Sequence, residues 1–229
     1  MSKPLSQPGS IALIYGPMYS GKTTELLRLV QRQELAGKRC VLIKYKADTR
    51  YDDESVITHD SKKGSCQTYK ADRLADVAPR IFSPDVDVIG IDEGQFYPDL
   101  AETSERLAKN GKIVIVAALN ARFDRKPFEQ VSLLIAYANE HHFLTAVCDC
   151  GVDATFTFRE ASDVEEVLIG GKKEYSACCR MCYYRKEKAM HDAENIELPG
   201  TKPAKKPRLS NQLSPFKPDF ASKSPVPAN

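Results

Sequence analysis

The chain of 229 residues has no hydrophobic run approaching the roughly 20 residues that a membrane-spanning helix requires. Residues 1–10 also lack the hydrophobic centre of a secretory signal peptide. Neither sign of charge is in excess, because 33 Lys and Arg oppose 31 Asp and Glu and leave a formal net charge of +2. No global basic field therefore points to nucleic acid or to a membrane surface. These absences predict a cytoplasmic protein without direct contact to membranes or nucleic acid.

Cysteine is sparse over most of the chain, and most of the seven cysteines lie between residues 148 and 182. In a reducing compartment an odd, clustered set favours a metal site over disulfides. Cys148 and Cys150 form one close pair, and Cys179 and Cys182 form a second with ideal C-x-x-C spacing. Two such pairs are typical of a closed, structural Zn²⁺ site with these four ligands. The first pair is one residue short, so Cys178 is an alternative ligand, and free thiols are the alternative to a metal site.

One segment carries the clearest chemical signal, because residues 16–23 fit the pattern G-x-x-x-x-G-K-[ST]. A short apolar run precedes the segment, and apolar residues at helical spacing follow it. Strand, glycine loop and helix together direct backbone N–H groups at a polyphosphate. The sequence therefore predicts that ATP phosphates bind at Gly16, Pro17, Met18, Tyr19, Ser20, Gly21, Lys22 and Thr23.

Apolar runs alternate with amphipathic segments between residues 11 and 147. Near-continuous apolar strands alternating with helices are typical of a mostly parallel sheet with helices on both faces, which predicts an α/β fold. The expected strands are 11–15, 40–45, 86–92, 112–118 and 144–147, and the expected helices follow the glycine loop and span 100–110 and 128–140. No long helical period is evident between 148 and 186.

Two carboxylates, Asp92 and Glu93, end the apolar run 88–91. At this place in a phosphate-loop fold, the first carboxylate supports Mg²⁺ and the second acts as a base. The base would serve either phosphoryl transfer to an alcohol or ATP hydrolysis. A solvated turn is the alternative interpretation of Asp-Glu-Gly.

The assembled motifs resemble those of the cytosolic-type thymidine kinases, a family with a RecA-like phosphate-loop domain and a zinc-tethered lasso. The resemblance covers residues 11 to about 186. It rests on the motifs at 16–23, 44–51, 58–60, 88–96, 117–120, 125–128, 144–148, 169–171, 175 and 179–182.

The resemblance implies phosphoryl transfer from ATP to the 5′-hydroxyl of thymidine, with Glu93 as general base and Mg²⁺ as cofactor. Beyond the glycine loop, the ATP-binding residues that it implies are Asp48, Thr49, Arg50, Asp92 and Gln95.

A lasso at roughly 151–178 would close over the base and read its edge mainly through backbone groups. The acceptor would be thymidine, with deoxyuridine as a further candidate. The implied substrate residues are Met18, Phe96, Leu119, Phe123, Thr157, Glu166, Val167, Leu168, Ile169, Gly170 and Tyr175. One departure lies near this pocket, where Asn120-Ala121-Arg122 replaces the family's small acidic-glycine turn.

The expected organisation is a flexible leader (1–10), a phosphate-loop domain (11–147), a zinc and lasso domain (148–190) and a disordered tail (191–229). The basic tail segment 202–208 suggests nuclear entry, and the resemblance implies a homotetramer or homodimer. Two alternatives remain open. One is an ATPase that acts with nucleic acid, and the other is a zinc-ribbon interaction module on a nucleotide switch.

Overall fold

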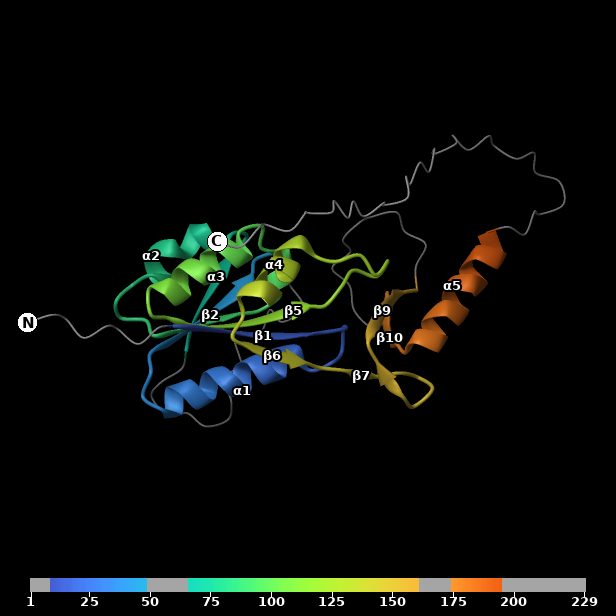
Figure 1. Cartoon of the computed structure of the whole chain (residues 1–229), viewed down its shortest axis with the longest axis horizontal. Helices are drawn as coiled ribbons and strands as arrows, with labels where there is room; N and C mark the ends of the chain where they lie inside the picture. The colour runs from blue at the N-terminus through green and yellow to red at the C-terminus, as the bar shows by residue number, and fades with distance from the viewer. Residues whose placement is uncertain (1–8, 49–65, 161–173, 195–229) are drawn as a thin grey trace, which may run out of the picture.

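Six parallel strands form the central sheet, in the order β3-β2-β4-β5-β1-β6 (Figure 1). This computed structural model describes residues 9–48, 66–160 and 174–194. The strands are β1 (Ser10–Gly16), β2 (Cys40–Tyr45), β3 (Gln67–Ala71), β4 (Val88–Ile91), β5 (Ile113–Leu119) and β6 (Glu140–Phe143). The predicted parallel α/β fold is confirmed, and β1 begins within the predicted leader.

Helices cover both faces of the sheet (Figure 1). On one face, Leu26 and Val30 of α1 pack against a buried cluster that includes Ile14 of β1. On the other face, Leu107 of α3 and Leu134 of α4 pack against a second cluster. Burial of both faces explains why the central strands are almost wholly apolar. The helices are α1 (Lys22–Leu35), α2 (Ala78–Ile81), α3 (Leu100–Lys109) and α4 (Glu129–Tyr137), with short 3₁₀ turns η1 (Leu74–Val77) and η2 (Gly94–Phe96).

The last strand of the sheet differs from the prediction at 144–147. Glu140–Phe143 (β6) pairs with β1 instead, whereas Ala146–Val147 (β7) lies in a separate hairpin with Asp153–Ala154 (β8). The edge strand β6 has mostly exposed side chains, so it needs no apolar pattern. The helix predicted at 128–140 was also too long, because α4 ends at Tyr137 and β6 begins at Glu140.

A second region follows β8, built from an antiparallel pair and a helix. Phe156–Arg159 (β9) pairs with Tyr175–Cys178 (β10), and α5 spans Arg180–Glu194. No long helical period was evident in residues 148–186, yet α5 begins at Arg180, and it extends past the predicted boundary at residue 190. Its sequence is polar on most sides, and Tyr183 and Met190 pack it against Phe158 of β9.

No helix within the described ranges is long and apolar enough to span a bilayer.

Candidate functional site

The ends of the parallel strands bring the predicted nucleotide residues to one edge of the sheet. The glycine loop follows β1, Asp48 lies just beyond β2, and Asp92 follows β4. Carboxyl ends of parallel strands share an edge, which is where ligands bind in open α/β sheets. Sequence-distant motifs therefore converge because of topology.

The glycine loop closes on one of its own carbonyl groups. Lys22 Nζ donates to Pro17 O at 2.7 Å, and Ser20 Oγ donates to the same oxygen at 2.9 Å. Gly21 has φ 83°, in the left-handed region that glycine adopts without strain, and α1 begins at the next residue. The loop thus presents a lysine and a helix N-terminus to the same space, an arrangement that suits a phosphate group.

Asp92 lies beside the first turn of α1. Thr23 Oγ1 donates to Asp92 Oδ1 at 3.1 Å, and the Glu93 backbone N–H donates to the same oxygen at 3.0 Å. Burial, followed by the charge of Glu93, raises the pKa of Asp92 to about 6 even though the Thr23 hydrogen bond opposes the shift. A divalent cation at this place would favour the ionised carboxylate. The hydroxyl and carboxylate oxygens are also the donor types that Mg²⁺ prefers.

Asp92→Asn is expected to raise the free energy of unfolding by about 1–3 kcal/mol at pH 7 without nucleotide or Mg²⁺. The raised pKa means that the folded chain retains a proton that the unfolded chain has released between about pH 4 and pH 6. Stability attributable to Asp92 therefore falls as the pH rises through that window, and asparagine removes this loss. Thermal unfolding of the ligand-free protein at pH 4.5 and pH 7 would measure it.

Asp87→Asn is the control, because the backbone N–H of Arg39 lowers the pKa of Asp87. This control should not stabilise the protein at pH 7. If Asp92→Asn were destabilising at pH 7, the burial argument for Asp92 would be wrong.

Glu93 is held by its neighbour Gln95. Gln95 Nε2 donates to Glu93 Oε2 at 2.5 Å, and Gln95 Oε1 accepts from the Leu119 N–H at 2.9 Å. Glu93 itself has φ 52°, a left-handed conformation that is uncommon for a residue with a side chain. Gln95 therefore connects the carboxylate to the end of β5 and fixes its direction. A cavity of about 180 Å³ opens beside this pair, and its lining includes Thr23, Asp48, Asp92 and Glu93.

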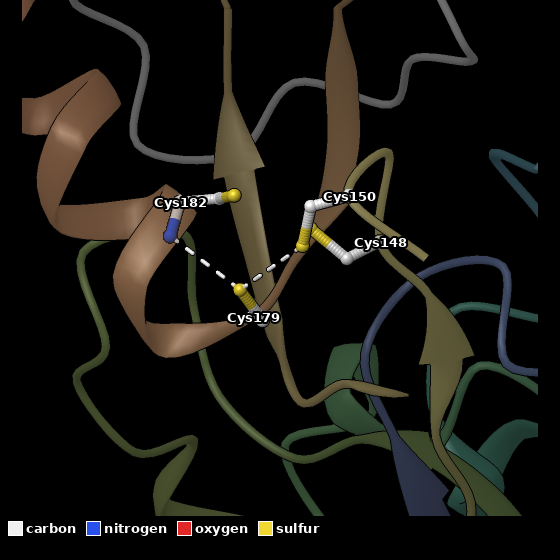
Figure 2. A group of neighbouring side chains, drawn as sticks. All are labelled: Cys148, Cys150, Cys179 and Cys182. Atoms are coloured by element: carbon white, nitrogen blue, oxygen red, sulfur yellow. Dashed lines mark hydrogen bonds between the residues drawn. The ribbon is translucent and has the colours of Figure 1, made fainter. Parts of the chain in front are cut away.

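Four cysteine side chains converge where β7, β8 and the start of α5 meet (Figure 2). The sulfur atoms of Cys148, Cys150, Cys179 and Cys182 all lie within 4.8 Å of one another, and those of Cys150 and Cys179 are 3.6 Å apart. Tetrahedral Zn–S bonds of about 2.3 Å require sulfur atoms about 3.8 Å apart. The four sulfurs therefore fit a metal ion, including both members of the short pair.

Backbone groups add to this arrangement. The Cys182 N–H donates to Cys179 Sγ at 3.5 Å (Figure 2). Burial alone would raise the pKa of Cys148, but hydrogen bonds from the N–H groups of Cys150 and Cys179 and from neighbouring thiols lower it to about 6. A thiolate is the form that ligates metals.

Cys178 does not join the four sulfurs. It is buried with Phe158 and Tyr183, and its sulfur lies 3.5 Å from Ser176 Oγ. Successive side chains of a strand point to opposite sides, so Cys178 and Cys179 diverge at the end of β10. The alternative that Cys178 substitutes as a ligand is not supported by this geometry.

The second region contacts the glycine loop directly. The Met18 N–H donates to Thr157 Oγ1 of β9 at 3.0 Å, and Asn120 Nδ2 donates to Thr155 O at 3.1 Å. The first bond joins residues that lie 139 positions apart in the sequence, and the second joins residues that lie 35 positions apart. The start of the predicted lasso therefore lies against the glycine loop, which would hold the phosphates.

The family model for thymidine kinase matches residues 9–183. The chain belongs to the thymidine kinase family. Thymidine kinase 1 of Dictyostelium discoideum is 45% identical over 213 residues, which cover 90% of this chain and 88% of the relative. The cytosolic thymidine kinase of Homo sapiens is 43% identical, with 86% of this chain and 84% of the relative covered. Thymidine kinase of Vaccinia virus (strain Western Reserve) is 48% identical, with 76% and 97% covered.

Within this thymidine kinase family member, two of the predicted substrate residues lie around a buried arginine. Arg159 Cζ lies 4.2 Å from the ring centre of Phe123, and its Nη2 donates to the Tyr175 hydroxyl at 3.0 Å. Sequence reasoning missed Arg159, although an arginine in the apolar strand Phe156–Arg159 is an unusual signal. Phe96, another predicted substrate residue, has its ring centre 4.9 Å from that of Tyr45.

Arg122, the cation in the unusual turn after β5, lies near a carboxylate. Its Nε is 3.3 Å from Asp124 Oδ1. Asp124 also lies 3.2 Å from Lys126 Nζ, so two cations of the turn share this one carboxylate.

Several predicted residues lie outside the described ranges. They are Thr49 and Arg50, the motif 58–60, the lasso residues Glu166, Val167, Leu168, Ile169 and Gly170, and the basic segment 202–208.

Proposed function

We propose that the protein transfers the γ-phosphoryl group of ATP to the 5′-hydroxyl of thymidine, with Glu93 as the general base. The observation that carries this proposal is that the glycine loop contacts both the Asp92 carboxylate and the second region. Thr23 at the end of the glycine loop donates a hydrogen bond to Asp92. Met18 of the same loop donates one to Thr157, near the start of the predicted lasso. A donor site and an acceptor site therefore share this loop.

The donor half consists of the loop N–H groups, Lys22 and the residues beside α1. Lys22 would exchange its bond to Pro17 O for phosphate oxygens, which offer a full negative charge. Mg²⁺, when bound with ATP, would neutralise phosphate charge, and Thr23 and Asp92 would hold it. Asp48, Thr49 and Arg50 remain proposed ATP-binding residues.

The acceptor half needs a base near the nucleoside hydroxyl. Gln95 directs the Glu93 carboxylate by binding Oε2. Glu93 would accept the proton of the 5′-hydroxyl as that oxygen forms its bond to phosphorus and the bond to ADP breaks. Positioning of the two substrates supplies most of the remaining rate enhancement.

The nucleoside base would lie between the sheet edge and the second region. We propose that Met18, Phe96, Leu119, Phe123, Thr157 and Tyr175 contact the nucleoside there, and that residues 166–170 close over the base. A buried site that reads a base edge by hydrogen bonds rejects other bases, because unpaired polar groups are costly.

We propose Zn²⁺ as the metal of the four-cysteine site, in a structural role. Four thiolate ligands leave no open position for chemistry. The ion would tie the β7–β8 hairpin to α5 and so hold the domain that begins at residue 148. The cytosol is the proposed compartment, since it keeps such thiols reduced and supplies ATP.

We also propose a homotetramer or homodimer. Ile135 and Tyr137 of α4 and Phe143 of the edge strand β6 are between 42% and 46% exposed, and such an assembly would cover them. Light scattering of the purified protein measures its mass, and a monomer at micromolar concentration would contradict this assembly.

A nucleoside panel tests the proposed function. With ATP and Mg²⁺, thymidine and deoxyuridine are expected to yield 5′-monophosphates, whereas purine deoxynucleosides yield little. Absence of monophosphate from every nucleoside, despite ATP binding, would contradict the proposal. The ATPase alternative predicts instead phosphate release stimulated by DNA, and the family match does not favour it.

A further inference from the structure

The turn at residues 122–126, which follows β5, has a constrained backbone. The Arg122 N–H donates to Lys126 O at 2.9 Å, and the Arg125 N–H donates to Arg122 O at 3.0 Å. Arg125 has φ 62°, in the left-handed region that costs energy for a residue with a side chain. Such a conformation persists when surrounding contacts hold it, so the contacts of Arg125 indicate what stabilises the turn.

The Arg125 side chain lies against two consecutive tyrosines of α5. Its Cζ is 4.7 Å from the ring centre of Tyr183 and 5.0 Å from that of Tyr184. Its Nη2 is 3.7 Å from Glu187 Oε1, one turn further along the helix. A planar guanidinium stacks on aromatic faces and pairs with a carboxylate at the same time, which a lysine does less well.

Tyr183 holds the same turn at a second point. Its hydroxyl donates to Phe123 O at 2.6 Å, and its ring is only 5% exposed. The ring is fixed by Phe156 and by Phe158, the latter in an edge-on contact at 5.3 Å. The hydroxyl is therefore carried on a rigid side chain that β9 keeps in place.

Phe123 is the residue that the turn contributes to the proposed nucleoside site. We infer that Tyr183 and Arg125 are positioning residues, which fix the backbone of Phe123 and thereby the place of its ring against the nucleoside. The inference rests on the proposed function, because it assumes that the ring contacts the acceptor. Neither residue touches the reacting atoms, so their removal weakens nucleoside binding more than the chemical step.

The position of Tyr183 in the chain connects this support to the cysteine site. Tyr183 directly follows Cys182, and α5 begins one residue after Cys179. The four cysteines therefore fix the position at which α5 begins, and Tyr183 of α5 holds the turn at residues 122–126. The Tyr183 hydroxyl thus joins two residues that lie 60 positions apart in the sequence.

Tyr183→Phe tests the inference, because it removes the hydroxyl and keeps the buried ring. The KM for thymidine is expected to rise about three- to ten-fold, the effect of losing one hydrogen bond, while kcat and the KM for ATP change less than about two-fold. Metal content and the melting temperature should stay near those of the wild type. Tyr137→Phe is the control, since it also removes one tyrosine hydroxyl, and Tyr137 is 44% exposed on α4, outside the second region and the turn at 122–126.

Arg125→Ala should raise the KM for thymidine in the same direction, and Arg125→Lys should restore only part of the loss. The combined Tyr183→Phe and Arg125→Ala variant should show less than the product of the two single effects, because both changes release the same turn.

The outcomes separate this inference from the proposed function. If the wild type phosphorylates no nucleoside, the proposed function fails and the inference fails with it. If the wild type phosphorylates thymidine and Tyr183→Phe has an unchanged KM for thymidine, the inference alone is overturned. Equal losses with thymidine and ATP would also overturn it, because they would indicate general damage.

Discussion

Glu93→Gln is expected to lower kcat by about 10²–10⁴-fold, the range attributed to general base catalysis, while ATP and thymidine still bind. Glutamine is nearly isosteric but cannot accept the proton of the 5′-hydroxyl. In the wild type, Gln95 Nε2 donates a hydrogen bond to the Glu93 carboxylate. The side-chain oxygen of the substituted glutamine can accept the same hydrogen bond. Steady-state kinetics and calorimetric binding of each substrate measure the two effects separately.

Glu102→Gln is the control for this substitution, because Glu102 is an exposed carboxylate on α3. It should leave kcat unchanged. A Glu93→Gln enzyme that retains more than about a tenth of the wild-type kcat would remove Glu93 from the role of base.

Cys179→Ser is expected to reduce bound zinc from about one ion per chain to nearly none, and to lower thymidine phosphorylation at least about a hundred-fold. Cys179 is one of four converging sulfurs, and its loss also removes the sulfur that accepts the Cys182 N–H. The β7–β8 hairpin and α5 then lose their common attachment. Metal analysis of the purified protein and thermal unfolding give readouts that do not depend on activity.

Cys178→Ser offers a closely matched control, since the two cysteines are adjacent and only Cys179 belongs to the cluster. The control should retain its zinc, although a buried hydroxyl costs some stability. If Cys178→Ser lost zinc and Cys179→Ser kept it, the ligand assignment would be wrong.

The central sheet was predictable because its middle strands are buried on both faces. The apolar run Cys40–Tyr45 was predicted as a strand and forms β2 with the same bounds. Edge strands carry a weaker signal, which explains the errors at the end of the sheet. The strand β6 reads Glu-His-His-Phe, and β3 is also largely exposed, so neither shows the apolar pattern that the prediction used.

Local motifs gave the candidate residues of the site, and long-range contacts supplied what the motifs could not. The roles of Gln95 and Tyr183 depend on bonds to Glu93, Leu119 and Phe123 that no spacing encodes. The raised pKa of Asp92 likewise depends on burial by the whole fold. The helix α5 escaped prediction because tertiary packing on β9 stabilises it, and its own pattern is weak.

The most direct test of the proposed phosphoryl transfer follows the γ-phosphoryl group itself. The protein is incubated with ATP labelled at the γ-phosphorus, Mg²⁺ and thymidine, and the products are separated. We expect the label on the 5′-oxygen of thymidine monophosphate in the wild type and almost none in Glu93→Gln. Label that appears only as inorganic phosphate, with thymidine unchanged, would contradict the proposed phosphoryl transfer.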